Sequence, residues 1–104
     1  MPAFDTLQVF QSMNSSPNAR LEHSAELGEG MAAALWTNHH DAREYEAPTH
    51  HTLSCYISGG TGTFRREQPG AKGSPGKLCV LPADHQSAWV INGEIRLAHV
   101  YVSQ

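Results

Sequence analysis

Histidine and cysteine are the residues of this chain that are best suited to metal chemistry. The sequence contains seven histidines and two cysteines. A catalytic metal site needs three or four nitrogen, oxygen or sulfur ligands that converge on an open position, as in zinc and non-haem iron sites. A conceivable set in this sequence is His51, Cys55, His85 and His99.

The adjacent histidines are poor candidates for a shared site. Neighbouring residues on a strand point to opposite faces of the sheet. At most one of His39 and His40, and one of His50 and His51, can therefore serve a given site. For His39 and His40 we favour the interpretation of a solvated strand end.

Cys55 is a potential nucleophile, with His51 as the residue that would activate it. Four positions separate the two residues on the same face of a predicted strand. At the usual rise of a strand their backbones lie ~13 Å apart, which is beyond direct hydrogen-bond reach. We therefore predict no catalytic residue and no enzyme activity.

Two spaced motifs carry the strongest fold signal. They are His51-x3-Cys55-x6-Gly62 and, fourteen residues later, Gly76-x5-Pro82. Both resemble the signature motifs of the cupin barrel. The resemblance implies an all-β fold, a cupin-like double-stranded β-helix or jelly-roll barrel, with His51 and Cys55 facing the interior.

Most of the metal ligands of the cupin motifs are missing. Thr49 stands at the first histidine, Cys55 at the glutamate, Asp84 at the second-motif glycine and Ser87 at its histidine. Because these replacements bind metal poorly or are wrongly placed, we expect no metal and no cofactor. His51 and His99 are then interior or rim histidines that hydrogen bonds satisfy.

A second resemblance narrows the function. The runs 50–60, 81–89 and 97–102 are similar to the N-terminal sensor domains of AraC-type transcriptional regulators, and the similarity covers residues 31–104. In that family the barrel binds a small effector or mediates dimerisation, and a separate C-terminal pair of helix-turn-helix units binds DNA. The resemblance implies a small-molecule effector as partner, and it is compatible with a homodimer.

The DNA-binding half is not found in this sequence. After Trp89 there is neither a helical period nor a cluster of Lys and Arg, as a helix-turn-helix domain would require. We therefore interpret residues 1–104 as a single regulatory domain, with DNA contacted only through a domain that this chain does not contain.

A barrel interior suits a small ligand when aromatic walls combine with a few polar groups. The aromatic and polar residues available for such a pocket are His51, Trp36, Tyr56, Phe64, Arg65, Trp89, His99 and Tyr101. For Arg65 and Arg66, which face opposite ways, a surface ion pair with Glu67 is the competing interpretation.

Two other functions stay open. The first is a stand-alone small cupin enzyme with a metal site, such as a dioxygenase or isomerase. The second is a structural dimerisation module, which would need a barrel filled with side chains and an exposed apolar strand edge or face.

The elements that must position these residues are mostly strands. Alternation and turn residues predict strands over 31–36, 51–57, 63–66, 77–81, 88–91 and 95–102, a mobile, solvated loop over 67–76 and a hairpin turn at 92–93. The segment 16–27 fits a short helix that starts at Ser16-Pro17, and its second half fits a strand equally well. Residues 4–10 are ambiguous between the same two structures.

Composition sets the outer limits. A chain of 104 residues with 39% apolar residues forms one domain with one core. Its net charge of −3 gives no basic surface for a phosphate backbone. No apolar run approaches the ~20 residues that cross a bilayer, and the N-terminus lacks a signal pattern. We therefore expect a soluble cytoplasmic protein with free thiols at Cys55 and Cys79.

Overall fold

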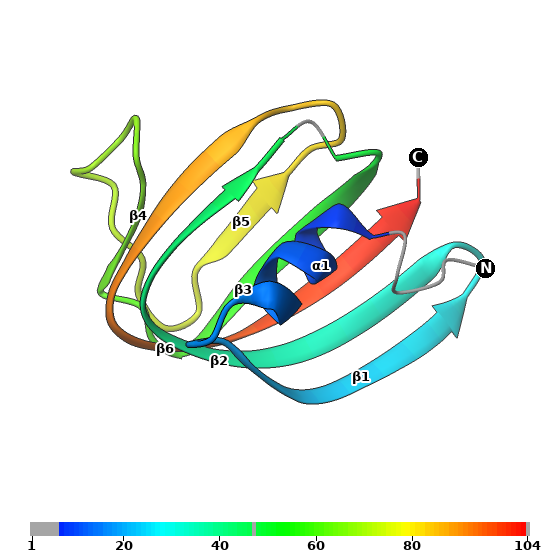
Figure 1. The fold of residues 1–104 in the computed structure, drawn as a ribbon, viewed down its shortest axis with the longest axis horizontal. Coiled ribbons are helices and arrows are strands. Elements are labelled where there is room, and N and C mark those ends of the chain that lie inside the picture. The colour runs from blue at the N-terminus through cyan, green and yellow to red at the C-terminus, as the bar shows by residue number, and fades with distance from the viewer. Residues whose placement is uncertain (1–6, 47, 104) are drawn as a thin grey trace.

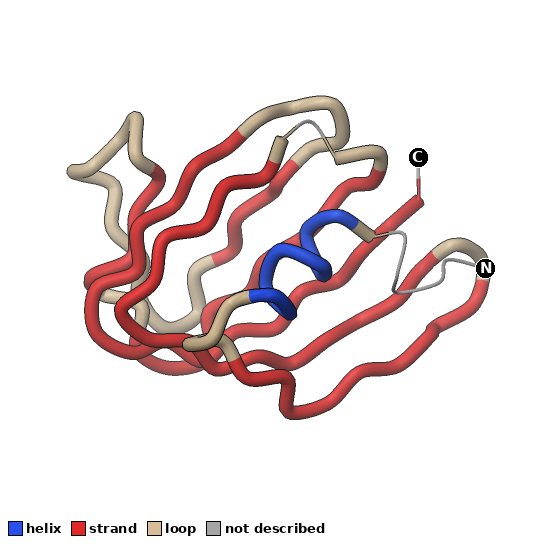
Figure 2. Tube along the Cα trace, in the orientation of Figure 1, coloured by secondary structure: helices blue, strands red, loops and turns tan. Residues whose placement is uncertain are grey.

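The computed structural model describes residues 7–46 and 48–103. Within these residues, one antiparallel sheet of strands curls around an interior, and a single short helix lies against it (Figures 1 and 2). The elements in chain order are α1 (Gln8–Ser15), β1 (Arg20–Gly28), β2 (Met31–Tyr45), β3 (His50–Gly59), β4 (Gly62–Arg65), β5 (Leu78–Leu81) and β6 (Ser87–Ser103). The predicted all-β class with a short N-terminal helix is confirmed.

The two longest strands form the frame of the fold. β2 and β6 pair along their whole length, from Met31 opposite Val102 to Tyr45 opposite Ser87. The other edge of β6 pairs with β3 over its second half and with β4 over its first half. Because both long strands bend midway, the sheet turns over on itself and encloses a core. The sheet order is β1-β2-β6-β3-β5, with β4 beside β6.

The predicted hairpin at 92–93 is wrong. The chain does not reverse there, because Ile91 and Glu94 both pair with β2, opposite Asp41 and His39. Gly93 has a φ of 76°, a left-handed conformation that glycine adopts without strain, and it lies at the bend of a continuous strand. An Asn-Gly pair therefore supplies a bend in this strand and not a turn between two strands.

We predicted that the first long strand ends at the polar cluster 38–41, and this is wrong. β2 continues to Tyr45, and the register shifts between His39 and Asp41. His40, at the shift, has a φ of 42°. Such a bulge bends a strand and increases its twist, so this polar segment forms the corner at which β2 passes from one half of the fold to the other.

The helix lies earlier in the chain than the segment 16–27. That segment forms β1, so its strand alternative is confirmed and its helical alternative is wrong. The helix α1 buries Val9, Phe10 and Met13, and Phe10 packs on the Trp36 ring with 5.3 Å between centroids. Of the ambiguous segment 4–10, residues 4–6 lie outside the described residues, and Gln8 begins the helix.

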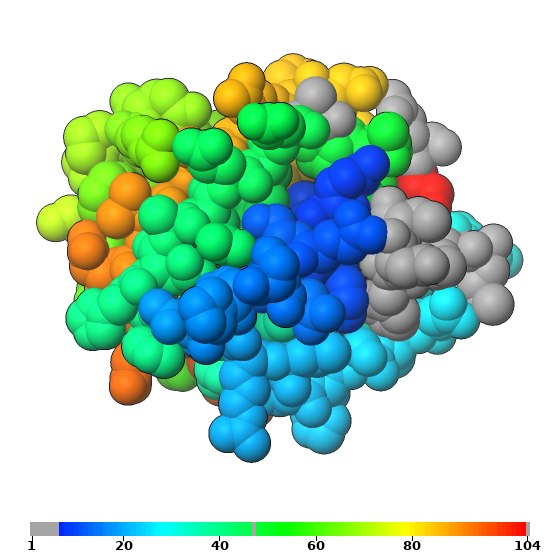
Figure 3. All heavy atoms as spheres, viewed as in Figure 1, coloured from blue at the N-terminus to red at the C-terminus, as the bar shows by residue number. Residues whose placement is uncertain are grey.

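Helix α1 closes one side of the core. Its atoms fill the centre of the face shown in Figure 3. The buried apolar residues that the helix and strands share are Leu7, Val9, Phe10, Met13, Ala32, Ala34, Trp36, Tyr45, Tyr56, Leu81, Ile91, Ile95, Leu97 and Tyr101.

The predicted inward face of β3 is wrong. His50, Thr52, Ser54 and Tyr56 are buried, whereas His51 is exposed and Cys55 is half-buried on the outer side. A shift of one residue exchanges the two faces of a strand. The resemblance to the cupin motif implied the opposite face, and Leu53 and Ile57, which share the face of His51 and Cys55, are exposed as well.

Neither cysteine is in a disulfide, as predicted. Within the described part of the chain no helix is long and apolar enough to cross a membrane.

Candidate functional site

A cluster of aromatic and histidine side chains lies in the core beneath α1. The Trp36 Nε1–H group donates to the Tyr101 hydroxyl at 3.2 Å, and His99 Nδ1 lies 3.4 Å from the same oxygen. The His50 ring also meets Tyr101 edge-on, with 5.8 Å between centroids. All four side chains are buried.

This cluster is uncharged at neutral pH. Burial and, to a smaller extent, the neighbouring His50 lower the pKa of His99 to about 3. Burial also lowers the pKa of His50 and raises that of Tyr101. His50 Nε2 accepts from the Val9 backbone N–H at 3.4 Å, so its proton sits on Nδ1, which lies 3.4 Å from both the His51 carbonyl and the Thr52 hydroxyl. The residues Trp36, His99 and Tyr101, predicted to bind a ligand, are instead satisfied core residues.

The interior beside this cluster has little free space. A cavity of about 30 Å³ remains, which is room for about one water molecule and far below the several hundred Å³ of a drug-sized ligand site. Its walls are Met13, Tyr45, Ser54, Tyr56, Thr63, Leu81, Trp89, Ile91, Ile95, Leu97 and His99. An effector-sized molecule therefore does not fit inside the folded barrel.

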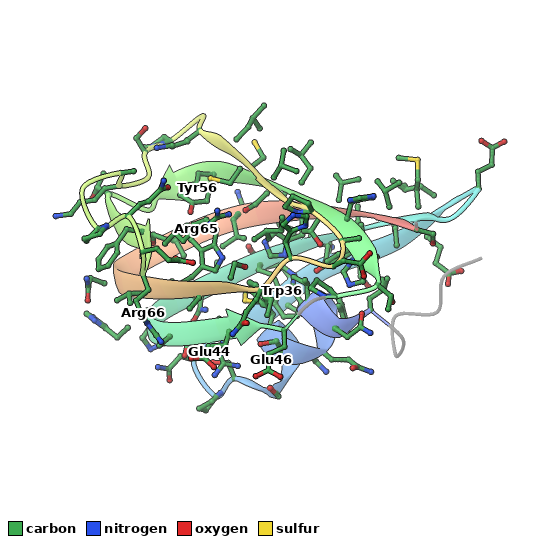
Figure 4. All side chains as sticks on the ribbon, turned by 90° about the horizontal axis from the view of Figure 1, so that it is seen from above. Trp36, Glu44, Glu46, Tyr56, Arg65 and Arg66 are labelled. Atoms are coloured by element: carbon green, nitrogen blue, oxygen red, sulfur yellow. The ribbon has the colours of Figure 1, made fainter. Side chains whose placement is uncertain are left out.

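A larger groove opens at the same end of the barrel. Its volume is about 200 Å³, and its walls are Tyr56, Arg65, Gln68, Ala71, Gly73, Lys77, Cys79, Val80 and Trp89. We call it the Arg65 groove. Tyr56 and Trp89 also line the internal cavity, so they form the wall between the two spaces. In Figure 4, Tyr56 and Arg65 lie close together at this end, and Trp36 lies nearer the middle of the molecule.

Arg65 is the most distinctive residue of the groove. Its guanidinium carbon lies 4.9 Å from the centroid of the Trp89 ring, in a cation–π contact. Its Nε is buried and has no hydrogen-bond partner within the described chain. Buried donors are nearly always paired, so this one is suited to an acceptor that enters the groove.

The groove has positive charge and no described carboxylate in its walls. Arg65 and Lys77 are its charged residues, and the Lys77 ammonium also donates to the Lys72 carbonyl at 3.0 Å. Burial and the adjacent Cys79 sulfur raise the pKa of Tyr56, so its phenol stays neutral. The combination of a guanidinium, an ammonium and two aromatic rings suits an organic anion.

The loop that completes the groove is held by its backbone. The N–H of Gly73 donates to the Thr63 carbonyl at 2.8 Å, and the N–H of Gly76 donates to the Tyr56 carbonyl at 2.7 Å. A Cβ at Gly73 would lie 2.0 Å from Tyr56 Cε2. Glycine at this position therefore lets the loop backbone lie against the Tyr56 ring. Most of the loop is exposed, as predicted, but this part of it is buried.

Three of the eight predicted ligand residues come together: Tyr56, Arg65 and Trp89. His51 does not join them, because it is exposed at the rim and its Nδ1 accepts from the Ala83 N–H at 2.9 Å. Phe64 lies between the inward-facing positions of β4, so its side chain points away from the interior and is only half-buried. Arg66 forms an exposed ion pair with Glu44 at 3.1 Å, and not with Glu67.

The conceivable metal set is not assembled. His99 is in the core, His51 is at the rim, and Cys55 faces outward. His85 is exposed, with its Nδ1 2.8 Å from the Ala83 carbonyl. Within residues 7–46 and 48–103, no group of three or more His, Cys, Asp or Glu side chains is arranged to hold a metal ion.

Sequence reasoning missed Lys77, Cys79 and Gln68 as groove residues. Cys79 reaches the groove because β5 pairs with β3, which places it opposite Ser54. The strand over 77–81 was predicted, but its partner was not, and the partner decides which side chains meet.

Comparisons with known proteins identify the fold. No family model matches the sequence, and no curated protein matches it significantly. Solved structures do match. A cupin superfamily protein from Desulfitobacterium hafniense has a TM-score of 0.68 and 13% identity, over 86% of this chain and 81% of that one.

Two further structures agree with that match. The EutQ protein of Clostridium difficile has a TM-score of 0.64 and 9% identity, over 88% of this chain and 73% of that one. KdgF from a Halomonas species has a TM-score of 0.64 and 14% identity, over 86% of this chain and 84% of that one. At these identities the likeness concerns the fold alone, and this chain has the cupin fold.

Proposed function

We propose that this chain is a non-catalytic ligand-binding domain that takes a small organic anion, most simply an aromatic carboxylate, in the Arg65 groove. The observation that carries the proposal is the buried, unpartnered Nε of Arg65 beside the Trp89 ring. A guanidinium presents parallel donors that match the two oxygens of a carboxylate. The Tyr56 and Trp89 rings provide flat apolar walls for the remainder of the ligand.

The regulatory role is the finer part of the proposal. It rests on the similarity of runs 50–60, 81–89 and 97–102 to AraC-type sensor domains. Ligand in the groove would favour one arrangement of the barrel relative to a DNA-binding domain, and so shift an equilibrium between two states. A reading frame that encodes two helix-turn-helix units after residue 104 is the expected genetic context.

Calorimetric titration tests ligand binding directly. A panel of aromatic and aliphatic carboxylates is compared with the matching neutral amides. We expect at least one carboxylate to bind and its amide to bind more than tenfold more weakly. Arg65→Gln should abolish binding. Arg66→Gln is the matched control, because Arg66 is the next residue and pairs with Glu44 on the exposed surface.

Two results would overturn the proposal. One is equal binding of carboxylate and amide, and the other is equal loss of binding in the two arginine variants. The alternative of a small metal-dependent cupin enzyme is tested separately by elemental analysis of the purified protein. Stoichiometric iron, zinc or nickel would overturn the non-catalytic assignment.

A further inference from the structure

The buried polar side-chain atoms that lack a hydrogen-bond partner within the described chain lie on one strand. They are the Oγ1 of Thr63 and the Nε of Arg65. Both residues belong to β4 and stand two positions apart, so their side chains point to the same face of the strand. Buried polar groups are nearly always paired. Two consecutive inward positions of β4 therefore each present a polar atom that is suited to a ligand group.

Thr63 faces the internal cavity. The residue is only 4% exposed, and it is part of the wall of the cavity of about 30 Å³. Its backbone is already bonded, because its N–H donates to the Gly60 carbonyl at 3.0 Å and its carbonyl accepts from the Gly73 N–H at 2.8 Å. The side-chain hydroxyl is therefore the group that is left for a partner, and the cavity is the space that such a partner would occupy.

The cavity suits a small neutral group. Its volume of about 30 Å³ is room for one water molecule, or for a hydroxyl group of similar size. Among the described residues of its walls there is no Asp, Glu, Lys or Arg. A charged group would lose its hydration there without meeting an opposite charge. A hydroxyl group, in contrast, would find in Thr63 a hydroxyl that both donates and accepts.

The cavity adjoins the Arg65 groove. Tyr56 and Trp89 line both spaces, and Arg65 supplies positive charge on the groove side. Residues two positions apart on a strand are ~6.8 Å apart. The separation of Thr63 and Arg65 along β4 is thus close to the length of one aromatic ring with a polar group at each end. The groove suits the charged end of such a molecule, and the cavity suits its neutral end.

We propose that Thr63 makes the Arg65 groove specific for carboxylates that carry a hydroxyl group at the opposite end, as in a para-hydroxylated aromatic acid. The carboxylate binds Arg65, and the ring lies against Tyr56 and Trp89. The hydroxyl reaches between these two rings into the cavity and forms a hydrogen bond with Thr63 Oγ1. This inference rests on the proposed function, because it names the ligand class of the same groove.

Calorimetric titration with para-hydroxybenzoate, benzoate and para-methylbenzoate tests the ligand class. A site that hydrogen-bonds a ligand hydroxyl disfavours the analogue that lacks it. We therefore expect the wild-type protein to bind para-hydroxybenzoate about tenfold more tightly than either of the other two acids. Because a methyl group is similar in size to a hydroxyl, para-methylbenzoate separates filling of the cavity from hydrogen bonding. Meta-hydroxybenzoate, whose hydroxyl points elsewhere, should bind like benzoate.

Three variants test the role of Thr63. Thr63→Val keeps the shape of the side chain and removes the hydroxyl, so it should bind para-hydroxybenzoate no more tightly than benzoate and should bind benzoate like the wild type. Thr63→Ser keeps a hydroxyl and should retain the preference. Thr61→Val is the matched control, because Thr61 is exposed just before β4, and it should bind all four acids like the wild type. Circular dichroism checks that each variant is folded.

The outcomes separate this inference from the proposed function. Equal affinity of the wild type for para-hydroxybenzoate, benzoate and para-methylbenzoate would overturn the inference and leave carboxylate binding at Arg65 intact, and this comparison needs no variant. A preference for the hydroxyl that survives Thr63→Val would show that another residue recognises it. If the wild type binds none of the carboxylates, the proposed function fails and the inference fails with it.

Discussion

The Arg65 guanidinium lies over the Trp89 ring, 4.9 Å from its centroid, and the two residues are direct partners across β4 and β6. Sheet pairing therefore fixes the stack before any ligand arrives. A preorganised guanidinium loses less conformational freedom on binding than a free side chain would. The register of β4 and β6 therefore positions the cation of the Arg65 groove before a ligand binds.

The first prediction concerns the shape of that cation. Arg65→Lys keeps the positive charge but loses the planar fork and the stacking on Trp89. We expect carboxylate affinity to fall about tenfold or more, equivalent to ~1.4 kcal/mol or more, in calorimetric titrations. Arg66→Lys should bind like the wild type. Full affinity in Arg65→Lys would show that charge alone suffices and that the fork contributes nothing.

A second prediction concerns pH. Burial holds the pKa of His99 near 3, below its ordinary 6.5. Between these two pH values the imidazole therefore binds a proton in the unfolded chain but not in the folded chain. The free energy of unfolding should therefore be highest above pH 6.5 and fall as pH decreases toward 3, by up to ~1.4 kcal/mol per pH unit for one such histidine.

The check on this second prediction is urea denaturation between pH 4 and 8, for wild type and His99→Gln. The variant should show a shallower decline, with a remainder from His50, whose pKa burial also lowers. Parallel curves for the two proteins would contradict the assignment.

A third prediction concerns the loop against Tyr56. Gly73→Ala places a methyl group 2.0 Å from Tyr56 Cε2, and overpacking of this kind costs about 1–3 kcal/mol. We expect a loss of that size in urea denaturation and weaker carboxylate binding, because the groove wall must move. Gly70→Ala is the control in the same loop, since a Cβ there meets nothing within 4 Å. Equal stability of the two variants would refute the prediction.

A fourth prediction concerns Asp41, which joins α1 to the bulge of β2. Burial alone would raise the pKa of this carboxyl, but hydrogen bonds from Ser16, Asn38 and the Ala42 N–H, with the charge of Arg43, lower it overall. Its stabilising contribution is therefore complete above its ordinary pKa of 3.8 and is lost as pH falls through the lower folded value.

Asp41→Asn should cost about 1.5–3 kcal/mol of unfolding free energy at pH 7, the range for hydrogen bonds to a charged group. The exposed Glu67→Gln variant should cost far less. Chemical denaturation at pH 7 and at pH 3 is the measurement. If the Asp41→Asn deficit is as large at pH 3 as at pH 7 or larger, the charge is not its cause.

Much of the fold was predictable because its signals are local. Alternation in 31–36 and 95–102 marked strands that the structure contains. The glycines at 59–62 were interpreted as the turn of a hairpin between 51–57 and 63–66, which is wrong, because β3 and β4 both pair with β6. The wrong predictions concern places where strand pairing, and not the local sequence, decides the structure. Asn92-Gly93 fits a hairpin locally, yet both flanking segments pair with β2, so the strand continues.

Part of the candidate site was predictable from residue type alone. Tyr56, Arg65 and Trp89 were identified by residue type, and the structure gathers them in the groove. His51 and Cys55 were assigned to the wrong face, because the assignment rested on the resemblance to the cupin motif, whereas in the structure His50, Thr52, Ser54 and Tyr56 are the buried residues of β3.

The end-to-end pairing of β2 with β6 has a kinetic consequence. Tyr45 meets Ser87 and Met31 meets Val102, so 42 (87 − 45) to 71 (102 − 31) positions separate the residues that must meet before the central pair of strands can form. Topologies dominated by such distant contacts fold in milliseconds to seconds, whereas helical proteins of similar stability fold far faster. Strand β6 pairs with β2, β3 and β4, so the pairs β1-β2 and β3-β5 are joined into one sheet only when β6 has formed.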